Sequence, residues 1–303
     1  MTAVESPIQD SYPTRIAGPA RTIARTDPTV WSAGTEFESG PLNPGELAGY
    51  EANGYLITEG LLSAAEVRTY QQELNRLSAD GRLRTDPRVV VEKKSAEVRS
   101  IFEVHKISEL IAQLVSDPRV VGRARQVLGS EVYVHQSRVN YLPGFKGAGF
   151  YWHSDFETWH AEDGMPAPRA CSISLALTDN FAYNGGLMVM PGSHRAFVPC
   201  VGETPADNYQ NSLREQEIGV PSHAQLSELV AGHGIGQFTG PAGSALLFDS
   251  NIMHGSGNNI TPFPRSNIFV VFNSVDNALG RPYAAPAPRP DFIASRDFTP
   301  LHR

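Results

Sequence analysis

The chain has 303 residues, of which 41% are hydrophobic and 19% charged, and it carries a formal charge of −7 at pH 7. This mild acidity argues against binding to nucleic acid or to an anionic membrane surface, because both need clustered positive charge. The apolar runs are too short to cross a membrane, and the first residues lack the charged start and apolar run of a secretion signal. We therefore expect a globular cytoplasmic protein.

The chain contains two cysteines, Cys171 and Cys200. Two are too few for a disulfide framework or a thiolate metal cage. One disulfide between them is an alternative, but the expected cytoplasmic location favours two reduced, packed thiols.

The first 43 residues are polar and rich in Pro, Gly and Thr, which predicts an extended N-terminal arm. The basic residues between Arg15 and Arg25 are interrupted by Pro and Gly, and we expect this part to be mobile. Residues 44–303 are predicted to form a single domain.

Helical patterns dominate residues 63–129. Before this region, the stretch GELAGYEANGYLIT at residues 45–58 predicts a short helix, a stop at Gly54 and a strand. Ser63 and Glu66 then form a capping box before an amphipathic run, and a later helix is predicted from Asp117-Pro118 to a stop at Gly129. The run KISELIAQLV before that helix is also predicted to be helical.

From residue 131 the pattern changes to short β-branched and aromatic runs separated by Gly, Pro and Asn. Because no helices alternate with these runs, a β-sandwich, barrel or jelly-roll core over about 131–276 is favoured over a parallel sheet. A polar insertion over about 200–235 interrupts the strands. Such an insertion is either a lid over a binding site or a passive surface loop.

The segment HSDFETWH places two histidines and two carboxylates within eight positions. In a strand, residues two apart share a face, so His153 and Asp155 can converge on one ion. Glu157 shares that face but would need a sharp bend of the strand to reach the same ion, and His160, which has the opposite parity, would need the strand to have ended. One imidazole and one carboxylate match part of the facial triad of non-haem iron enzymes, although a solvated polar strand has the same pattern.

A third ligand would come from another histidine. His194 in MPGSHR and His254 in FDSNIMHGSG have the most suitable surroundings, and the strand pattern favours His254 only slightly. Arg265 follows at the head of the apolar strand SNIFVVF, where a guanidinium could bind a carboxylate through two hydrogen bonds.

The seventeen residues from Phe150 to Pro166, FYWHSDFETWHAEDGMP, resemble the signature segment of the ectoine hydroxylases. These enzymes belong to the phytanoyl-CoA-hydroxylase-like branch of the Fe(II)/2-oxoglutarate dioxygenases. The resemblance continues through QSRVNYLPGFKG, NGGLMVMPGSH, HGSGNN with Arg265 beyond it, and NGYLITEGLLS, and so spans most of the chain after residue 40.

The resemblance implies a double-stranded β-helix (jelly-roll) core with flanking helices. It implies Fe(II) held by His153, Asp155 and His254, with O2 and 2-oxoglutarate as co-reactants. The residues that it places around 2-oxoglutarate are Arg265, Asn140, Gln136, Ser174, Phe102 and Phe150.

For the substrate, the resemblance implies that Thr158 and Trp159 face a bound ectoine, a small zwitterion with a carboxylate and an amidinium. Arg138 is the expected partner of the carboxylate, Gln136 of a ring N–H group, and Trp159 and Phe269 of the ring faces. Four further polar residues of the signature are expected to hold its shape by hydrogen bonds: Glu157, His160, Glu162 and Asp163.

The implied reaction is hydroxylation of L-ectoine to 5-hydroxyectoine with release of succinate and CO2, a step of compatible-solute biosynthesis in osmoprotection. Relatives form homodimers, and the resemblance implies the same here. The alternatives are a related dioxygenase for another small polar or amino-acid-like molecule, and a non-catalytic metal-binding jelly-roll sensor.

Overall fold

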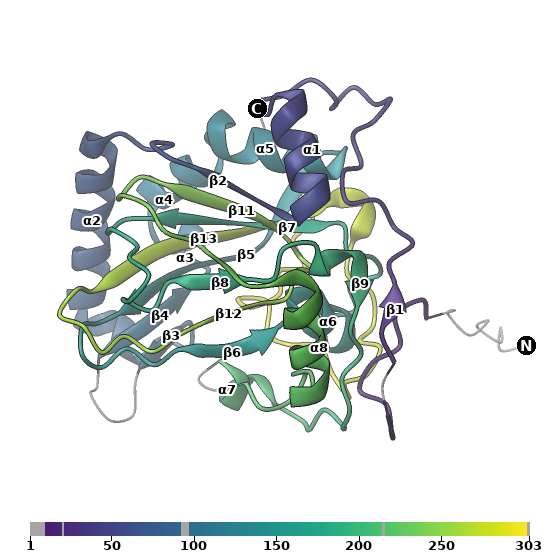
Figure 1. The fold of residues 1–303 in the computed structure, drawn as a ribbon. Coiled ribbons are helices and arrows are strands. Elements are labelled where there is room, and N and C mark those ends of the chain that lie inside the picture. Colours follow the sequence, from purple (N-terminus) through teal and green to yellow (C-terminus); the bar gives the residue numbers. More distant parts are fainter. Residues whose placement is uncertain (1–9, 20, 92–96, 214–215, 302–303) are drawn as a thin grey trace, which may run out of the picture.

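The computed structural model describes residues 10–19, 21–91, 97–213 and 216–301, and two antiparallel sheets dominate it (Figure 1). The larger sheet runs in the order β2 (Tyr55–Thr58), β11 (Ala245–Asp249), β7 (Ala170–Ala176), β13 (Arg265–Ser274), β5 (Val132–Leu142), β4 (Val98–Phe102) and β3 (Val89–Val91). The smaller runs in the order β10 (Gly236–Gln237), β8 (Leu187–Val189), β12 (His254–Ser256) and β6 (Phe150–His153). Two facing antiparallel sheets are the predicted jelly-roll architecture.

Helices cover the outer face of the larger sheet. They are α1 (Pro44–Asn53), α2 (Ala64–Ala79), α3 (Val104–Ile107), α4 (Glu109–Val115) and α5 (Pro118–Leu128), while α6 (Asp155–Thr158), α7 (Tyr209–Ser212) and α8 (His223–His233) lie in the loops between the later strands. The predicted helix signals are confirmed: Ser63 and Glu66 form the capping box of α2, Asp117 caps α5, and Gly129 ends it at φ +59°.

The strands of the larger sheet alternate between two cores, as the two-residue period of a strand requires. In β13, Ile268 and Val270 face the helices and join their core, whereas Phe269 faces the smaller sheet. Leu187 and Val189 of β8 meet Phe269 there. The space between the two sheets is therefore the interior of the jelly roll.

The boundaries expected for the helical region and the β core need correction. The region 63–129 also contains β3 and β4, and β2 precedes it, so the larger sheet draws strands from before residue 131. The polar insertion is not structureless, because it contains α7 and α8.

The expectation of a mobile basic arm was wrong for the residues that the structure describes. Tyr12 and Arg15 are buried, and β1 (Ile23–Ala24) pairs with β9 (Ala196–Phe197), as the purple strand in Figure 1 shows. The described part of the arm lies packed along the jelly roll.

Candidate metal centre and ligand cavity

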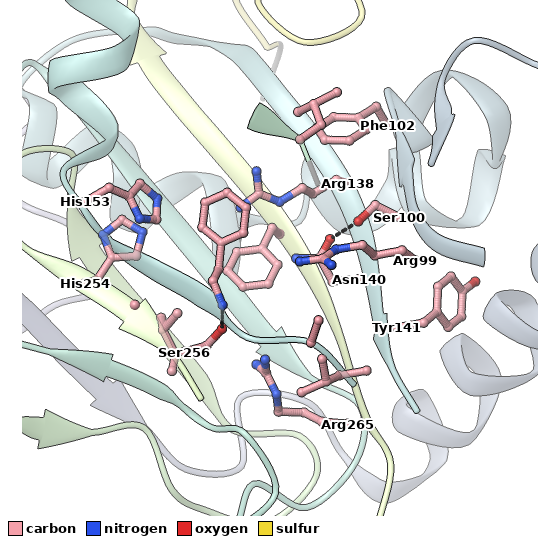
Figure 2. A pocket seen from close by; sticks show the side chains of 17 residues that line it. Arg99, Ser100, Phe102, Arg138, Asn140, Tyr141, His153, His254, Ser256 and Arg265 are labelled. Carbon is pink, nitrogen blue, oxygen red and sulfur yellow. Dashed lines mark hydrogen bonds between the residues drawn. The ribbon is translucent and has the colours of Figure 1, made fainter. Parts of the chain in front are cut away.

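Two histidines from neighbouring strands lie face to face. His153 is the last residue of β6 and His254 the first of β12, and the antiparallel pairing places them opposite one another. Their ring centroids are 4.2 Å apart, and both side chains are buried (Figure 2).

Asp155 completes the cluster, though not in the way that strand alternation suggested. The strand ends at His153, the Ser154 hydroxyl accepts a hydrogen bond from the Glu157 backbone N–H, and the chain turns into α6. The Asp155 carboxylate then lies 3.5 Å from Nε2 of His153 and 3.8 Å from Nε2 of His254. One ligand atom from each residue falls within 4.8 Å of the others, which is the donor set of a facial triad.

Backbone carbonyls fix which imidazole nitrogen faces Asp155. Nδ1 of His153 lies 2.8 Å from the Tyr151 carbonyl, and Nδ1 of His254 lies 3.1 Å from the Ile252 carbonyl. A carbonyl oxygen only accepts, so each Nδ1 carries a proton, and Nε2 is the ring nitrogen left to bind a metal. The cluster therefore turns two Nε2 atoms toward the Asp155 carboxylate, the arrangement in which imidazoles commonly bind metals.

The protonation states agree with this role. Burial would raise the pKa of the Asp155 carboxyl, but His254, His153 and Arg138 together hold it below its usual value. Burial, helped by the neighbouring His153, lowers the pKa of His254 to about 4. At neutral pH the site thus holds an ionised carboxylate and an uncharged His254, which suits a divalent cation.

The alternative ligand His194 lies elsewhere. Its Nε2 contacts the Glu51 carbonyl of α1, 3.1 Å away, and its ring packs against Gly54. The preference for His254 is confirmed by the geometry.

A cavity opens between the sheets beside the two histidines. Charged, polar and aromatic side chains from β4, β5, β6, β12 and β13 supply most of its wall. It is lined by Arg99, Ser100, Phe102, Arg138, Asn140, Tyr141, Leu142, Ala148, Phe150, His153, Leu187, Leu213, His254, Gly255, Ser256, Arg265 and Phe269 (Figure 2).

Two arginines, the buried Arg265 and the half-buried Arg138, face this cavity without a carboxylate partner among the described residues. Nε of Arg265 makes no hydrogen bond, and burial lowers the pKa of Arg265 to about 10. Arg138 donates one hydrogen bond to Oε1 of Gln136 at 2.7 Å, leaves its Nε unpaired, and stacks on the Phe269 ring at 5.0 Å. Because a cation that is shielded from water and has no carboxylate beside it is costly, both arginines indicate a site for anionic ligands.

Other residues expected at the ligands lie just behind this wall. Gln136 donates to the Ile293 carbonyl besides accepting from Arg138, and Ser174 accepts from Asn267. Trp159 packs in an apolar cluster, and Thr158 accepts a hydrogen bond from Gln216. None of these four expected residues is among the lining side chains, so their contact with ligands stays a prediction.

The four polar signature residues expected to hold the loop do make such contacts. Partners of their side chains are Arg15 for Glu157, Asp10 and the Met165 carbonyl for His160, Asn208 for Glu162, and Arg289 for Asp163. The shape of the signature is thus fixed by residues from both ends of the chain.

Sequence reasoning missed several lining residues. Arg99 and Ser100 come from β4, whose pattern VRSIF was hidden within the supposedly helical region. Ser100 donates to Oδ1 of Asn140 at 2.8 Å and so orients that amide. Leu213 comes from the polar insertion, which carried no apolar signal for a cavity wall.

The comparisons with known proteins agree with this geometry. A family model described as phytanoyl-CoA dioxygenase (PhyH) matches residues 50–267. The chain belongs to the phytanoyl-CoA dioxygenase family. An ectoine dioxygenase from Nocardia farcinica is 64% identical over 292 residues, which cover 96% of this chain and 95% of that protein.

Solved structures of this family extend the likeness to three dimensions. The crystal structure of EctD from S. alaskensis with 2-oxoglutarate and 5-hydroxyectoine aligns with a TM-score of 0.86 at 46% identity over 95% of both chains. The same protein with bound Fe aligns with a TM-score of 0.86 at 44% identity over 97% of both chains. The predicted jelly-roll fold and family are thereby confirmed. Within the described ranges, no helix combines the length and apolar character of a membrane crossing.

Proposed function

We propose that this protein is an Fe(II)- and 2-oxoglutarate-dependent dioxygenase that hydroxylates L-ectoine to 5-hydroxyectoine and releases succinate and CO2. The observation that carries the proposal is a two-histidine, one-carboxylate cluster beside one cavity, whose wall includes two arginines with no carboxylate partner among the described residues. The metal cluster matches the iron, and the arginines match two carboxylate-bearing ligands. The 64% identity to an ectoine dioxygenase supports the choice of substrate.

The donor set fits a ferrous ion. His153 and His254 would bind through Nε2 while their Nδ1–H groups stay on backbone carbonyls, and Asp155 would bind through its carboxylate. Iron, when bound, supplies the oxygen chemistry that couples decarboxylation of 2-oxoglutarate to hydroxylation of the substrate. The protein's part is to hold the two organic molecules beside that ion and to keep water away.

For 2-oxoglutarate, Arg265 is the proposed partner of the carboxylate remote from the iron. Its buried guanidinium would gain the partner that it otherwise lacks. Asn140, oriented by Ser100, lies on the same wall, while Phe102 and Phe150 provide apolar surface. Ser174 is a proposed contact from behind this wall.

For ectoine, Arg138 is the proposed partner of the carboxylate. Gln136 holds its guanidinium, and the Phe269 ring beneath it keeps the charge in place. We also propose Gln136, Thr158 and Trp159 as substrate contacts, as the family resemblance implies.

The test is a coupled turnover assay. Protein loaded anaerobically with Fe(II) and 2-oxoglutarate is mixed with oxygen and ectoine, and 5-hydroxyectoine and succinate are measured by NMR. We expect equal amounts of the two products. Succinate formed in response to proline or a similar solute, but not to ectoine, would favour the related-dioxygenase alternative; metal binding without any turnover would favour the sensor.

Three broader features are also part of the proposal. A cytoplasmic location is supported by the two buried free thiols of Cys171 and Cys200. A single domain over residues 44–303 is supported by the core shared between the helices and the larger sheet. The homodimer is tested by light scattering on the purified protein, where a monomeric mass would contradict it.

A further inference from the structure

Arg15 is an unusual residue of the N-terminal arm. It is not a glycine, yet its backbone adopts the left-handed conformation with φ +54°. Its guanidinium donates from Nε to Oε1 of Glu157 at 2.7 Å and from Nη2 to Oε2 at 3.0 Å, and both side chains are 1% exposed. A strained backbone persists only where the surroundings impose it, which indicates that this contact is strongly specified.

Arg25, ten residues later, repeats the arrangement at a second loop. Its Nη1 lies 2.9 Å from each carboxylate oxygen of Asp249, and both side chains are 2% exposed. Its Nη2 also donates to the carbonyls of Pro28 and Pro168.

Each of these carboxylates lies close in sequence to a residue of the metal cluster. Glu157 is two residues after Asp155 within α6, and Asp249 ends β11 five residues before His254. The two loops also contact each other, because the Phe156 backbone N–H donates to the Ser250 carbonyl at 2.8 Å. The arm thus binds both loops through residues that do not line the cavity.

The polar insertion closes over the Arg15 contact. Nη1 of Arg15 donates to the Thr204 hydroxyl at 3.0 Å. Gly219, at φ +76°, lies so close that an added Cβ would be 2.3 Å from Nη2 of Arg15 and 2.6 Å from Oε2 of Glu157. The insertion therefore packs directly against the Arg15–Glu157 pair.

We propose that Arg15 and Arg25 are positioning residues of the metal centre: from the N-terminal arm they fix the loops that carry Asp155 and His254. A buried ion pair is a poor source of stability, because desolvation offsets most of the attraction, but it fixes geometry. Removing a contact that holds a metal ligand in place commonly weakens metal binding by about 10- to 100-fold. This inference rests on the proposed function, because it presupposes a metal ion at the cluster.

The test uses variants that remove each pair without leaving a buried charge. These are Arg15→Met with Glu157→Gln and Glu162→Gln, because Nη2 of Arg15 also lies 3.2 Å from Oε1 of Glu162, and Arg25→Met with Asp249→Asn. Gly219→Ala is a third variant, which keeps all charges and displaces the Arg15 pair by its volume. Arg21→Met is the control, because Arg21 belongs to the same arm and its side chain is exposed.

Two measurements separate positioning from general stability. Co(II), which absorbs visible light when bound by nitrogen and oxygen ligands, is titrated into each metal-free protein to give its dissociation constant. The melting temperature of each protein is measured with and without Co(II), since at one ligand concentration a more tightly bound ligand stabilises the folded state more. In the two ion-pair variants and in Gly219→Ala we expect Co(II) to bind at least about tenfold more weakly, with an altered visible spectrum. The Co(II)-induced rise in melting temperature should also be smaller in these three variants.

A lower melting temperature without metal, combined with an unchanged Co(II) dissociation constant, would show that the pairs only stabilise the fold and would overturn the proposal. Weaker binding by Arg21→Met to the same degree would also overturn it. A wild-type protein that binds no Co(II) would overturn the metal centre itself, and with it the positioning role.

Discussion

At the scale of single residues, Arg265 and Arg138 share a cavity but have different surroundings. Arg265 has an unpaired Nε and, among the described residues, no aromatic ring beneath its guanidinium, whereas Arg138 is held by Gln136 and lies over Phe269. The difference suits the remote carboxylate of a flexible dicarboxylate at Arg265 and the carboxylate of a small zwitterion at Arg138. The two arginines should therefore affect different substrates.

Replacing each arginine by alanine tests this division. A charge-assisted hydrogen bond contributes about 1.5–3 kcal/mol, so Arg265→Ala should raise the KM for 2-oxoglutarate by about 10- to 100-fold and leave that for ectoine nearly unchanged. Arg138→Ala should do the reverse. Initial rates measured by succinate release at varied concentrations of each compound give both constants, and equal effects on the two substrates would contradict the assignment.

The sequence allowed some of these residues to be found and hid others. The spacing of His153 and Asp155 was enough to suggest a shared ion, although the strand that justified it ends at His153. Trp159 was harder to place, because a capped helical turn following the strand changes where each later side chain points. Arg15 carried no signal at all, since its partner Glu157 is 142 residues away.

At the scale of elements, the helices were predictable because their ends are marked locally by Ser63, Asp117 and Gly129. The strands β3 and β4 were missed, since they are short and lie between stronger helical patterns. β4 becomes a strand by pairing with β5, a contact between distant segments, and β3 becomes one by pairing with β4. Local signals report local structure, and pairing across the chain is invisible to them.

Two glycines show how an element end differs from its interior. Gly129 ends α5 at φ +59°, and an added Cβ would lie 2.4 Å from the Trp31 carbonyl oxygen. Gly49 lies inside α1, where an added Cβ meets nothing within 4 Å. Gly129→Ala should therefore lower the free energy of unfolding by about 2 kcal/mol, and Gly49→Ala should raise it by about 0.5–1 kcal/mol. Urea denaturation followed by circular dichroism measures both, and changes of the same sign would contradict this account.

At the scale of the whole molecule, buried histidines link stability to pH. Burial lowers the pKa of His135 from 6.5 to about 4, and neither ring nitrogen has a hydrogen-bond partner. The unfolded chain binds this proton more tightly than the folded protein does. Above about pH 6.5, His135 therefore does not lower the free energy of unfolding. As the pH falls toward 4, its preference for the proton in the unfolded chain lowers that free energy by roughly 3 kcal/mol.

Melting temperatures of the metal-free protein between pH 7.5 and 4.5 test this linkage. We expect a fall below pH 6.5 that is less steep in His135→Leu. The exposed His233 is the control, and His233→Gln should leave the slope unchanged. A wild-type slope in His135→Leu would mean that His135 does not contribute.

The pairing of His153 with His254 also has a mechanical consequence. β6 is the outermost strand of the smaller sheet, and within the described strands its one neighbour is β12. An ion bound by both imidazoles would cross-link β6 to β12. Without the ion, β6 would be held to the sheet mainly by its few backbone hydrogen bonds with β12. Amide hydrogen exchange over 150–153 should accordingly slow when Co(II) is added, while exchange in β7 stays the same. Since Phe150 lines the cavity, fraying of this edge in the metal-free protein would open the interior to incoming ligands, and metal binding would shut that route.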